Sequence, residues 1–221
     1  MAVSVAQAFI NIATGGPDAI TATVGSGTSR ILVFVNWDED ATTNIINPFR
    51  IGDQAFTGSF NWNHGTETTQ MWLHYWDEAA LDARSNSVIT FTDTQNVSGY
   101  IYGTYEGVDQ TTPLTELDQE EAENAAANLT LSGSSTSADY LLAIATRANG
   151  NVNRQVTDWD SLTEIDQLNP AAHQCMAGHG LGGDTDTLLQ SATSDDWLAA
   201  LMKVNALASG IVIPVPTGPW R

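Results

Sequence analysis

Short runs of apolar residues separated by polar turns recur along most of the chain, and this pattern predicts antiparallel β-strands. Residues 19–24 and 87–92 alternate apolar and polar positions, as strands with one buried face do. Residues 31–35 and 140–146 are apolar at nearly every position, which predicts central strands covered on both faces. We therefore expect an all-β fold built as an antiparallel sandwich.

Residues 99–113 (GYIYGTYEGVDQTTP) show the repeating unit most clearly. Their aromatic and β-branched residues predict a strand, and the Gly, Asp and Pro residues that follow predict a turn. Residues 49–57 predict a hairpin that turns at Gly52-Asp53, and residues 71–76 predict a strand rich in aromatic side chains. The polar residues 77–86 are expected to link two strands.

Two segments have a different local pattern. Residues 118–128 combine acids with alanines, which gives them helical propensity. In residues 195–207, a helix capped by Ser194-Asp195-Asp196 would gather several apolar side chains on one face. These side chains are Trp197, Leu198, Leu201 and Met202. The local pattern leaves helix and strand open for both segments.

The chain has 221 residues, of which 42% are hydrophobic, and this supports a single large domain that we assign to residues 1–208. Residues 1–18 are expected to form an N-terminal arm or an edge strand. Residues 209–221 contain three prolines. Because proline cannot donate a ladder hydrogen bond, these residues are expected to form an extended tail.

The charge balance is strongly acidic, with 26 acidic against 7 basic residues and a formal net charge of -19. Such a surface repels phosphate backbones and anionic lipid, so neither nucleic acid nor a membrane is expected as a partner. The single cysteine excludes a disulfide framework within the chain. We find no secretory signal pattern and no apolar run of about 18 residues, so we expect a protein made in the cytoplasm.

Aromatic and histidine residues provide the first candidate site. Trp62, Trp72, His74 and Trp76 could form a platform on which sugar rings stack. Strand alternation places Trp72, His74 and Trp76 on one face, but a half-buried core strand explains the same pattern more simply. His173 and His179 have no third ligand at metal-binding spacing, so we expect no zinc site.

A Gly/Asp segment provides the second candidate. Its carboxylates could bind calcium, although a solvated turn explains the segment more simply. The candidate ligands are Asp184, Asp186, Asp195 and Asp196. The chain contains no nucleophile elbow, phosphate-binding loop or metalloprotease motif. We therefore expect no cofactor and no enzymatic activity.

The order of these features resembles the jelly-roll β-sandwich domains of tailed-phage virion proteins, which also occur in bacterial surface proteins. The resemblance covers roughly residues 21–204 and rests on turn and core residues. The matching stretches are GDQAFT at 52–57, GVDQTTP at 107–113 and SATSDDWLAA at 191–200. In this family a late strand centred on tryptophan ends the sandwich, so the resemblance implies a strand rather than a helix at 191–200.

The resemblance implies a non-enzymatic structural protein of the virion that decorates or cements the capsid. A tail or fibre component, or an adhesin that binds host glycans, is the alternative. The implied partners are copies of the chain itself, as a trimer, and other virion proteins such as the major capsid protein. Assembly contacts would come from the two ends of the chain: Phe9, Ile10, Ile213, Pro214, Pro216 and Trp220.

Overall fold

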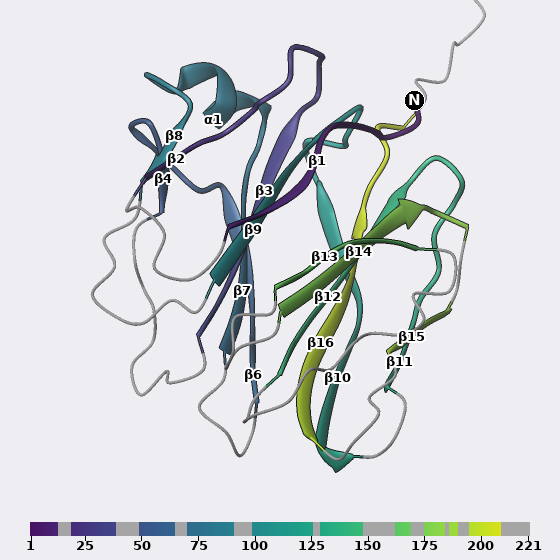
Figure 1. The fold of residues 1–221 in the computed structure, drawn as a ribbon. Helices are drawn as coiled ribbons and strands as arrows, with labels where there is room; N and C mark the ends of the chain where they lie inside the picture. Colours follow the sequence, from purple (N-terminus) through teal and green to yellow (C-terminus); the bar gives the residue numbers. More distant parts are fainter. Residues whose placement is uncertain are drawn as a thin grey trace, which may run out of the picture.

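The computed structural model describes residues 1–12, 19–38, 49–64, 70–90, 99–125, 129–147, 162–168, 175–183, 186–189 and 195–208. In these residues the chain forms antiparallel strands and one short helix (Figure 1). The all-β sandwich predicted from the sequence is confirmed, whereas its assignment as a jelly roll stays a prediction.

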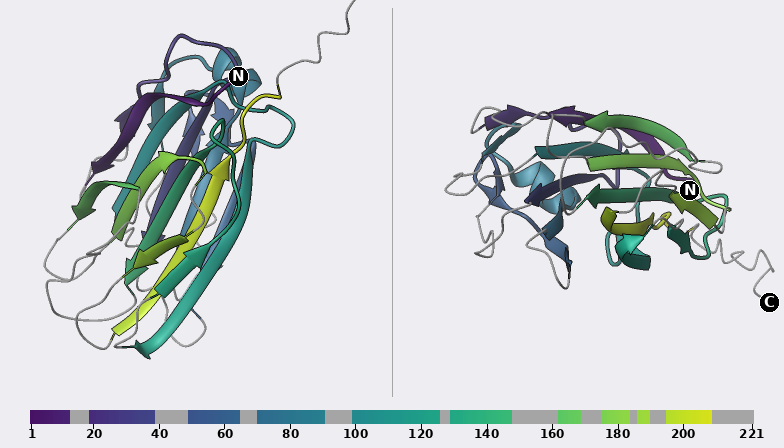
Figure 2. Two further views of the ribbon diagram at one scale, coloured as in Figure 1. Left: turned by 90° about the vertical axis from the view of Figure 1, so that its right-hand side faces the viewer. Right: turned by 60° about the horizontal axis from the view of Figure 1, so that its bottom comes forward.

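Two five-stranded sheets form the centre of the molecule. Sheet I has the order β1-β9-β3-β7-β6, formed by β1 (Ser4–Ile12), β9 (Gly99–Glu106), β3 (Ile31–Asp38), β7 (Gln70–Trp76) and β6 (Gly58–Asn63). Sheet II has the order β10-β16-β12-β14-β13, formed by β10 (Leu114–Ala125), β16 (Asp195–Val204), β12 (Tyr140–Arg147), β14 (Cys175–Leu181) and β13 (Thr163–Leu168). Many of their long strands run along the length of the molecule (Figure 2).

Two smaller sheets and a helix complete the described part of the chain. Outer sheet I has the order β2-β8-β4-β5, formed by β2 (Ala19–Thr21), β8 (Val88–Thr90), β4 (Arg50–Ile51) and β5 (Gln54–Ala55). Outer sheet II pairs β11 (Leu129–Ser132) with β15 (Asp186–Leu189). Helix α1 (Glu78–Ala83) lies in the segment predicted to be a simple polar link. Asp77 begins this helix as an N-cap, since its side chain accepts a hydrogen bond from Ala80 N at 2.9 Å.

The four sheets stack as layers because β3 and β12 are apolar on both faces. Ile31, Val33 and Val35 join the core between sheets I and II, while Leu32 and Phe34 point to the core beneath outer sheet I. Strand β12 alternates in the same way between the central core and a third core that includes Leu131 of β11. The prediction of doubly covered central strands is confirmed.

The described strands of the two halves of the chain have the same topology. Apart from the β4–β5 hairpin, the described strands of the first half are β1, β2, β3, β6, β7, β8 and β9 in turn, and those of the second half are β10 to β16. In each half the large sheet has the order first-seventh-third-fifth-fourth, and the second strand pairs with the sixth. A similar segment precedes each central strand, GSGTS at 25–29 and GSSTS at 133–137. The molecule is therefore built from two equivalent halves that share one central core.

The contacts between the two halves are related to one another by an approximate two-fold axis. Ile31 pairs with Tyr105 in the first half, and Tyr140 pairs with Val204 at the same place in the second half. Counting on from these pairs, Gly107 corresponds to Ala206, and Val108 corresponds to Leu207. Val108 forms a bridge with Ala206, and Leu207 N donates to Gly107 O at 2.8 Å. Each of these contacts is the image of the other, so an approximate two-fold axis passes between the two segments.

The N-terminal segment is an edge strand of sheet I rather than a free arm. Strand β1 pairs with β9, and the Met1 ammonium group donates to Leu207 O at 2.9 Å. Val3 N also donates to Ala138 O at 2.8 Å. These contacts join the start of the chain to the second half, close to the described C-terminal residues (Figure 1).

The two segments with helical character are strands where the structure describes them. Residues 118–125 lie in β10, and residues 195–204 lie in β16, which pairs with both β10 and β12. The implied strand at the tryptophan-centred segment is confirmed for residues 195–200. The helical propensity of 118–125 is overridden because this segment is the only described ladder partner of β16 on that side.

Candidate functional site

The aromatic strand β7 alternates its side chains between two faces, as predicted from the sequence, and each face packs against a core. Met71 and Leu73 lie in the core between the large sheets, whereas Trp76 lies beneath outer sheet I. Trp62, on the neighbouring strand β6, belongs to the central core and so lies on the opposite face of the sheet from Trp76. Register and burial thus separate residues that the sequence had grouped together.

The sugar platform is not formed. Trp62 is 2% exposed, His74 is 3% exposed and Trp76 is fully buried, while Trp72 is half-buried. A stacking platform must offer a ring face to solvent, and three of the four residues use their rings for core packing instead. The Trp76 indole Nε1 donates to Gln54 O at 3.1 Å, which fixes it under the β4–β5 hairpin.

A small hollow of about 150 Å³ lies where β6 of sheet I meets β10 of sheet II. We call it the edge hollow, and its lining residues are Asn63, Gln119, Glu120, Glu121 and Leu198. Beside it, Trp62 Nε1 donates to Glu116 Oε2 at 2.8 Å, and His64 Nδ1 lies 3.7 Å from Glu121 Oε1. These contacts connect the edges of the two large sheets, so the carboxylates of β10 hold the sandwich together here.

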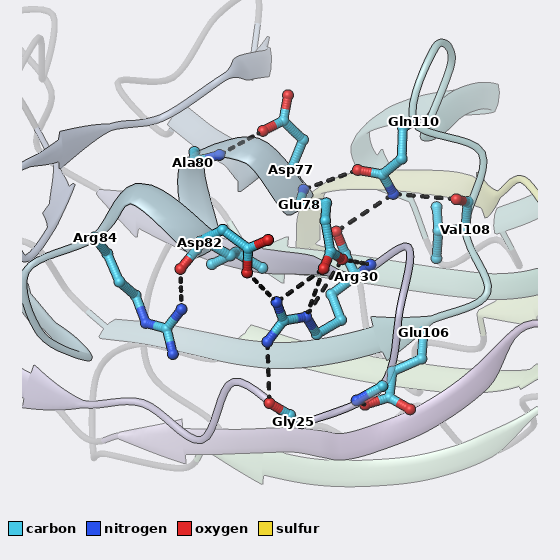
Figure 3. Close-up of polar contacts among 12 residues, drawn as sticks. Gly25, Arg30, Asp77, Glu78, Ala80, Asp82, Arg84, Glu106, Val108 and Gln110 are labelled. Carbon is cyan, nitrogen blue, oxygen red and sulfur yellow. Dashed lines mark hydrogen bonds and ion pairs between the residues drawn. The ribbon is translucent and has the colours of Figure 1, made fainter.

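A second polar cluster surrounds Arg30, directly before β3 (Figure 3). The Arg30 guanidinium donates to Glu78 Oε1 at 2.8 Å, to Asp82 Oδ1 and to Gly25 O at 3.2 Å, and the Arg30 backbone N–H also donates to Glu78. Arg30 is 8% exposed. Its side chain therefore joins helix α1 to the start of the central strand and to the loop that precedes it.

Gln110 connects this cluster to the turn that follows β9 (Figure 3). Its side-chain carbonyl accepts from Glu78 N at 2.8 Å, and its amide nitrogen donates to Val108 O at 3.1 Å. Asp109 closes the turn itself, because its carboxylate accepts from Thr111 N at 2.7 Å and Thr112 N at 3.1 Å. The GVDQTTP stretch is thus a structural junction.

Charge pairing within the cluster shifts the pKa values of its members. Burial alone would raise the pKa of Glu78, but hydrogen bonds from the Arg30 side chain and backbone outweigh it and hold that pKa below its ordinary value. The hydrogen bond to Glu78 raises the pKa of Arg30 by more than burial lowers it. Both groups stay ionised at neutral pH, which suits an ion pair with a structural role.

Asp139 has the corresponding position before β12 in the second half. Its carboxylate accepts from Thr136 N, Thr136 Oγ1 and Ala206 N, each at 2.9 Å. Burial would raise the pKa of Asp139, but these hydrogen bonds lower it overall. Each half therefore places one buried charged residue immediately before its central strand, with opposite signs in the two halves.

Sequence reasoning missed Arg30, Glu78, Gln110 and Asp139. A signal was available, because Arg30 and Asp139 each stand directly before an apolar strand and follow a Gly/Ser/Thr segment. A charged side chain at the start of a strand that is buried on both faces needs a partner. Such a position therefore predicts either a buried ion pair or a turn closed by a carboxylate.

For most of the remaining candidate residues, the structure describes either no atoms or only the backbone. Asp184 is not among the residues that the structure describes. Asp186 lies in β15, and Asp195 and Asp196 lie in β16, but the structure describes only the backbone of these three residues. His173 also lies outside the described residues, as do Ile213, Pro214, Pro216 and Trp220. Phe9 and Ile10 lie in the edge strand β1.

His179, by contrast, is described: its Nδ1 hydrogen-bonds the Tyr140 hydroxyl between β14 and β12. Among the residues described, no three His, Cys, Asp or Glu side chains converge as metal ligands do. None of the described helices is long and apolar enough to cross a bilayer.

The described polar groups therefore serve mainly to join elements of the fold. The edge hollow offers carboxylate acceptors and amide donors, and its nearest neighbours connect the two large sheets. Comparison of the chain with protein-family models, with curated proteins and with solved structures finds no match.

Proposed function

We propose that this protein is a non-enzymatic structural component of a virus particle, which decorates or cements the capsid surface. The observation that supports this most is the use of its polar and aromatic groups inside the fold. Arg30, Glu78, Gln110 and Asp139 join secondary-structure elements, and Trp62 and Trp76 fill cores. Such a molecule resists deformation, as a building block must.

The layered architecture is consistent with this role. Both faces of the central strands are covered, so local opening of these strands must expose large apolar areas. The formal charge of -19 keeps free copies apart in solution until a complementary surface is met. The partners in this proposal are other copies of the chain, as a trimer, together with the major capsid protein.

Fractionation of assembled particles tests the proposal. Particles from cells that carry the gene are banded on a density gradient, and the chain is quantified by mass spectrometry against the major capsid protein. We expect a fixed copy number, in a multiple of three, that persists through a second gradient. A soluble acidic β-sandwich protein of similar mass, added to the same lysate, controls for adhesion. If the chain stays at the top of the gradient together with the control protein, instead of banding with the particles, the proposal is refuted.

A further inference from the structure

His74 is a buried ionisable group beneath the β4–β5 hairpin. It is 3% exposed, and neither ring nitrogen has a hydrogen-bond partner among the described residues. The residues on either side of the hairpin contact its ring. Phe49 lies 4.8 Å and Phe56 lies 4.6 Å from it, centroid to centroid. Two aromatic contacts with one histidine thus help to hold the hairpin on sheet I, together with the hydrogen bond from Trp76 Nε1 to Gln54 O.

The groups that face His74 carry no charge in the described part of the chain. On β3, Phe34 is its cross-strand partner and Asn36 is a diagonal neighbour, and on β6 its partner is Ser59. Trp72 stacks against it at 6.2 Å from within β7. On the hairpin, Arg50 donates to the backbone oxygen of Asp53, and the Arg50 side chain is exposed.

A proton on His74 would therefore be a buried charge without a counter-charge among the described groups that face it. Burial lowers the pKa of His74 to about 4. An imidazolium is costly in an aromatic shell unless it reaches water. One route to water is separation of the two phenylalanines from the ring, which requires the short pairing of β4 with β8 to give way.

We propose that the β4–β5 hairpin is an acid-released flap, which neutral His74 holds on sheet I and which opens when that side chain takes up a proton. Opening exposes Phe49, Phe56 and the Trp76 indole, while sheet II keeps its packing. This inference does not rest on the proposed virion role, since it concerns only the packing of one layer on another.

Hydrogen exchange of the full chain at pH 7.5 and pH 5 tests the flap. The pKa of His74 is about 4 when the flap is closed, and it should return to the ordinary 6.5 when the flap is open. The equilibrium constant for opening should therefore be about 30-fold larger at pH 5 than at pH 7.5. We expect the protection factors of residues 49–56 to fall by about that amount, while those of 140–146 stay unchanged. A fall of equal size in both segments, or none in the first, overturns the proposal.

Two variants and one direct measurement sharpen the test. His74→Phe should abolish the pH response of residues 49–56, whereas His179→Phe, a histidine substitution in the other half, should keep it. A response that survives in His74→Phe overturns the proposal. If His74→Phe does not fold, NMR titration of the natural protein decides: a His74 midpoint near 4 that Phe49 and Phe56 ring signals follow supports the flap, whereas phenylalanine signals that do not move with His74, or a midpoint near 6.5, overturn it.

Discussion

Arg30 and Asp139 show how single residues determine the entry to each central strand. Both are charged, both are 8% exposed, and both stand one residue before an apolar strand. Arg30 uses two carboxylates of helix α1, whereas Asp139 uses backbone and hydroxyl donors. The two halves thus solve the same packing requirement with different chemistry.

Replacement of Arg30 by methionine should destabilise the fold by about 3 kcal/mol, because the Glu78 carboxylate then loses its partner in a partly buried site. Urea unfolding followed by tryptophan fluorescence measures this loss. Arg50→Met is the matched control, since the exposed Arg50 donates only to Asp53 O, and its cost should stay within about 0.5 kcal/mol. Equal losses for the two variants would contradict a structural role for the Arg30 cluster.

Asp139→Asn should cost about 2 kcal/mol at pH 7, because charge-assisted hydrogen bonds from Thr136 and Ala206 are weakened. The folded-state pKa of Asp139 is lowered, so its contribution is present above the ordinary value of 3.8 and lost as pH falls through the folded value. The stability gap between the two proteins should therefore narrow between pH 5 and pH 3. A gap that is constant across this range would show that the charge of Asp139 is unimportant.

At the scale of elements, the turn after β9 connects both halves. Gly107 has a positive φ of 73°, and a Cβ atom there would lie 2.8 Å from the backbone oxygen of Ala2. Its N–H donates to Thr28 O at 3.1 Å, while its carbonyl accepts from Leu207 N at 2.8 Å. Four segments of the chain therefore meet at one residue that has no side chain.

Gly107→Ala should lower the free energy of unfolding by at least about 2 kcal/mol, from left-handed backbone strain plus the clash with Ala2. Gly183→Ala isolates the first contribution, because Gly183 also has a positive φ but a Cβ atom there would meet nothing within 4 Å. Chemical denaturation of both variants gives the comparison. A loss at Gly107 no larger than that at Gly183 would argue against close packing at the turn.

At the scale of the molecule, the internal two-fold axis relates the described ends of the chain to the middle. By the strand registers, Met1 corresponds to Gln110 and Ala208 corresponds to Asp109. The first and last described residues therefore lie where the peptide bond between Asp109 and Gln110 lies in the other half. Met1 already lies within hydrogen-bonding distance of Leu207. The order in which the two halves follow each other should matter little to the fold.

A circular permutant that begins at Gln110, ends at Asp109 and joins Ala208 to Met1 through a short Gly/Ser linker should fold. Its unfolding free energy should lie within about 2 kcal/mol of the linear 1–208 chain, because the sheet pairings of both halves are kept. Circular dichroism and urea unfolding measure this. A permutant with the same linker, opened at Gly52-Asp53, is the control: if it folds and the first does not, the halves are not interchangeable.

The sequence alone determined the all-β class, the doubly covered strands β3 and β12, and the β4–β5 hairpin, because apolar periodicity and turn residues act locally. Tertiary structure decided that β10 is a strand, that Trp62 and Trp76 are buried on opposite faces, and that Arg30 meets Glu78. It also decided the pairing of two equivalent halves. The reason is physical: these outcomes depend on which strand becomes the neighbour of which, and long-range pairing leaves little trace in any short stretch of residues.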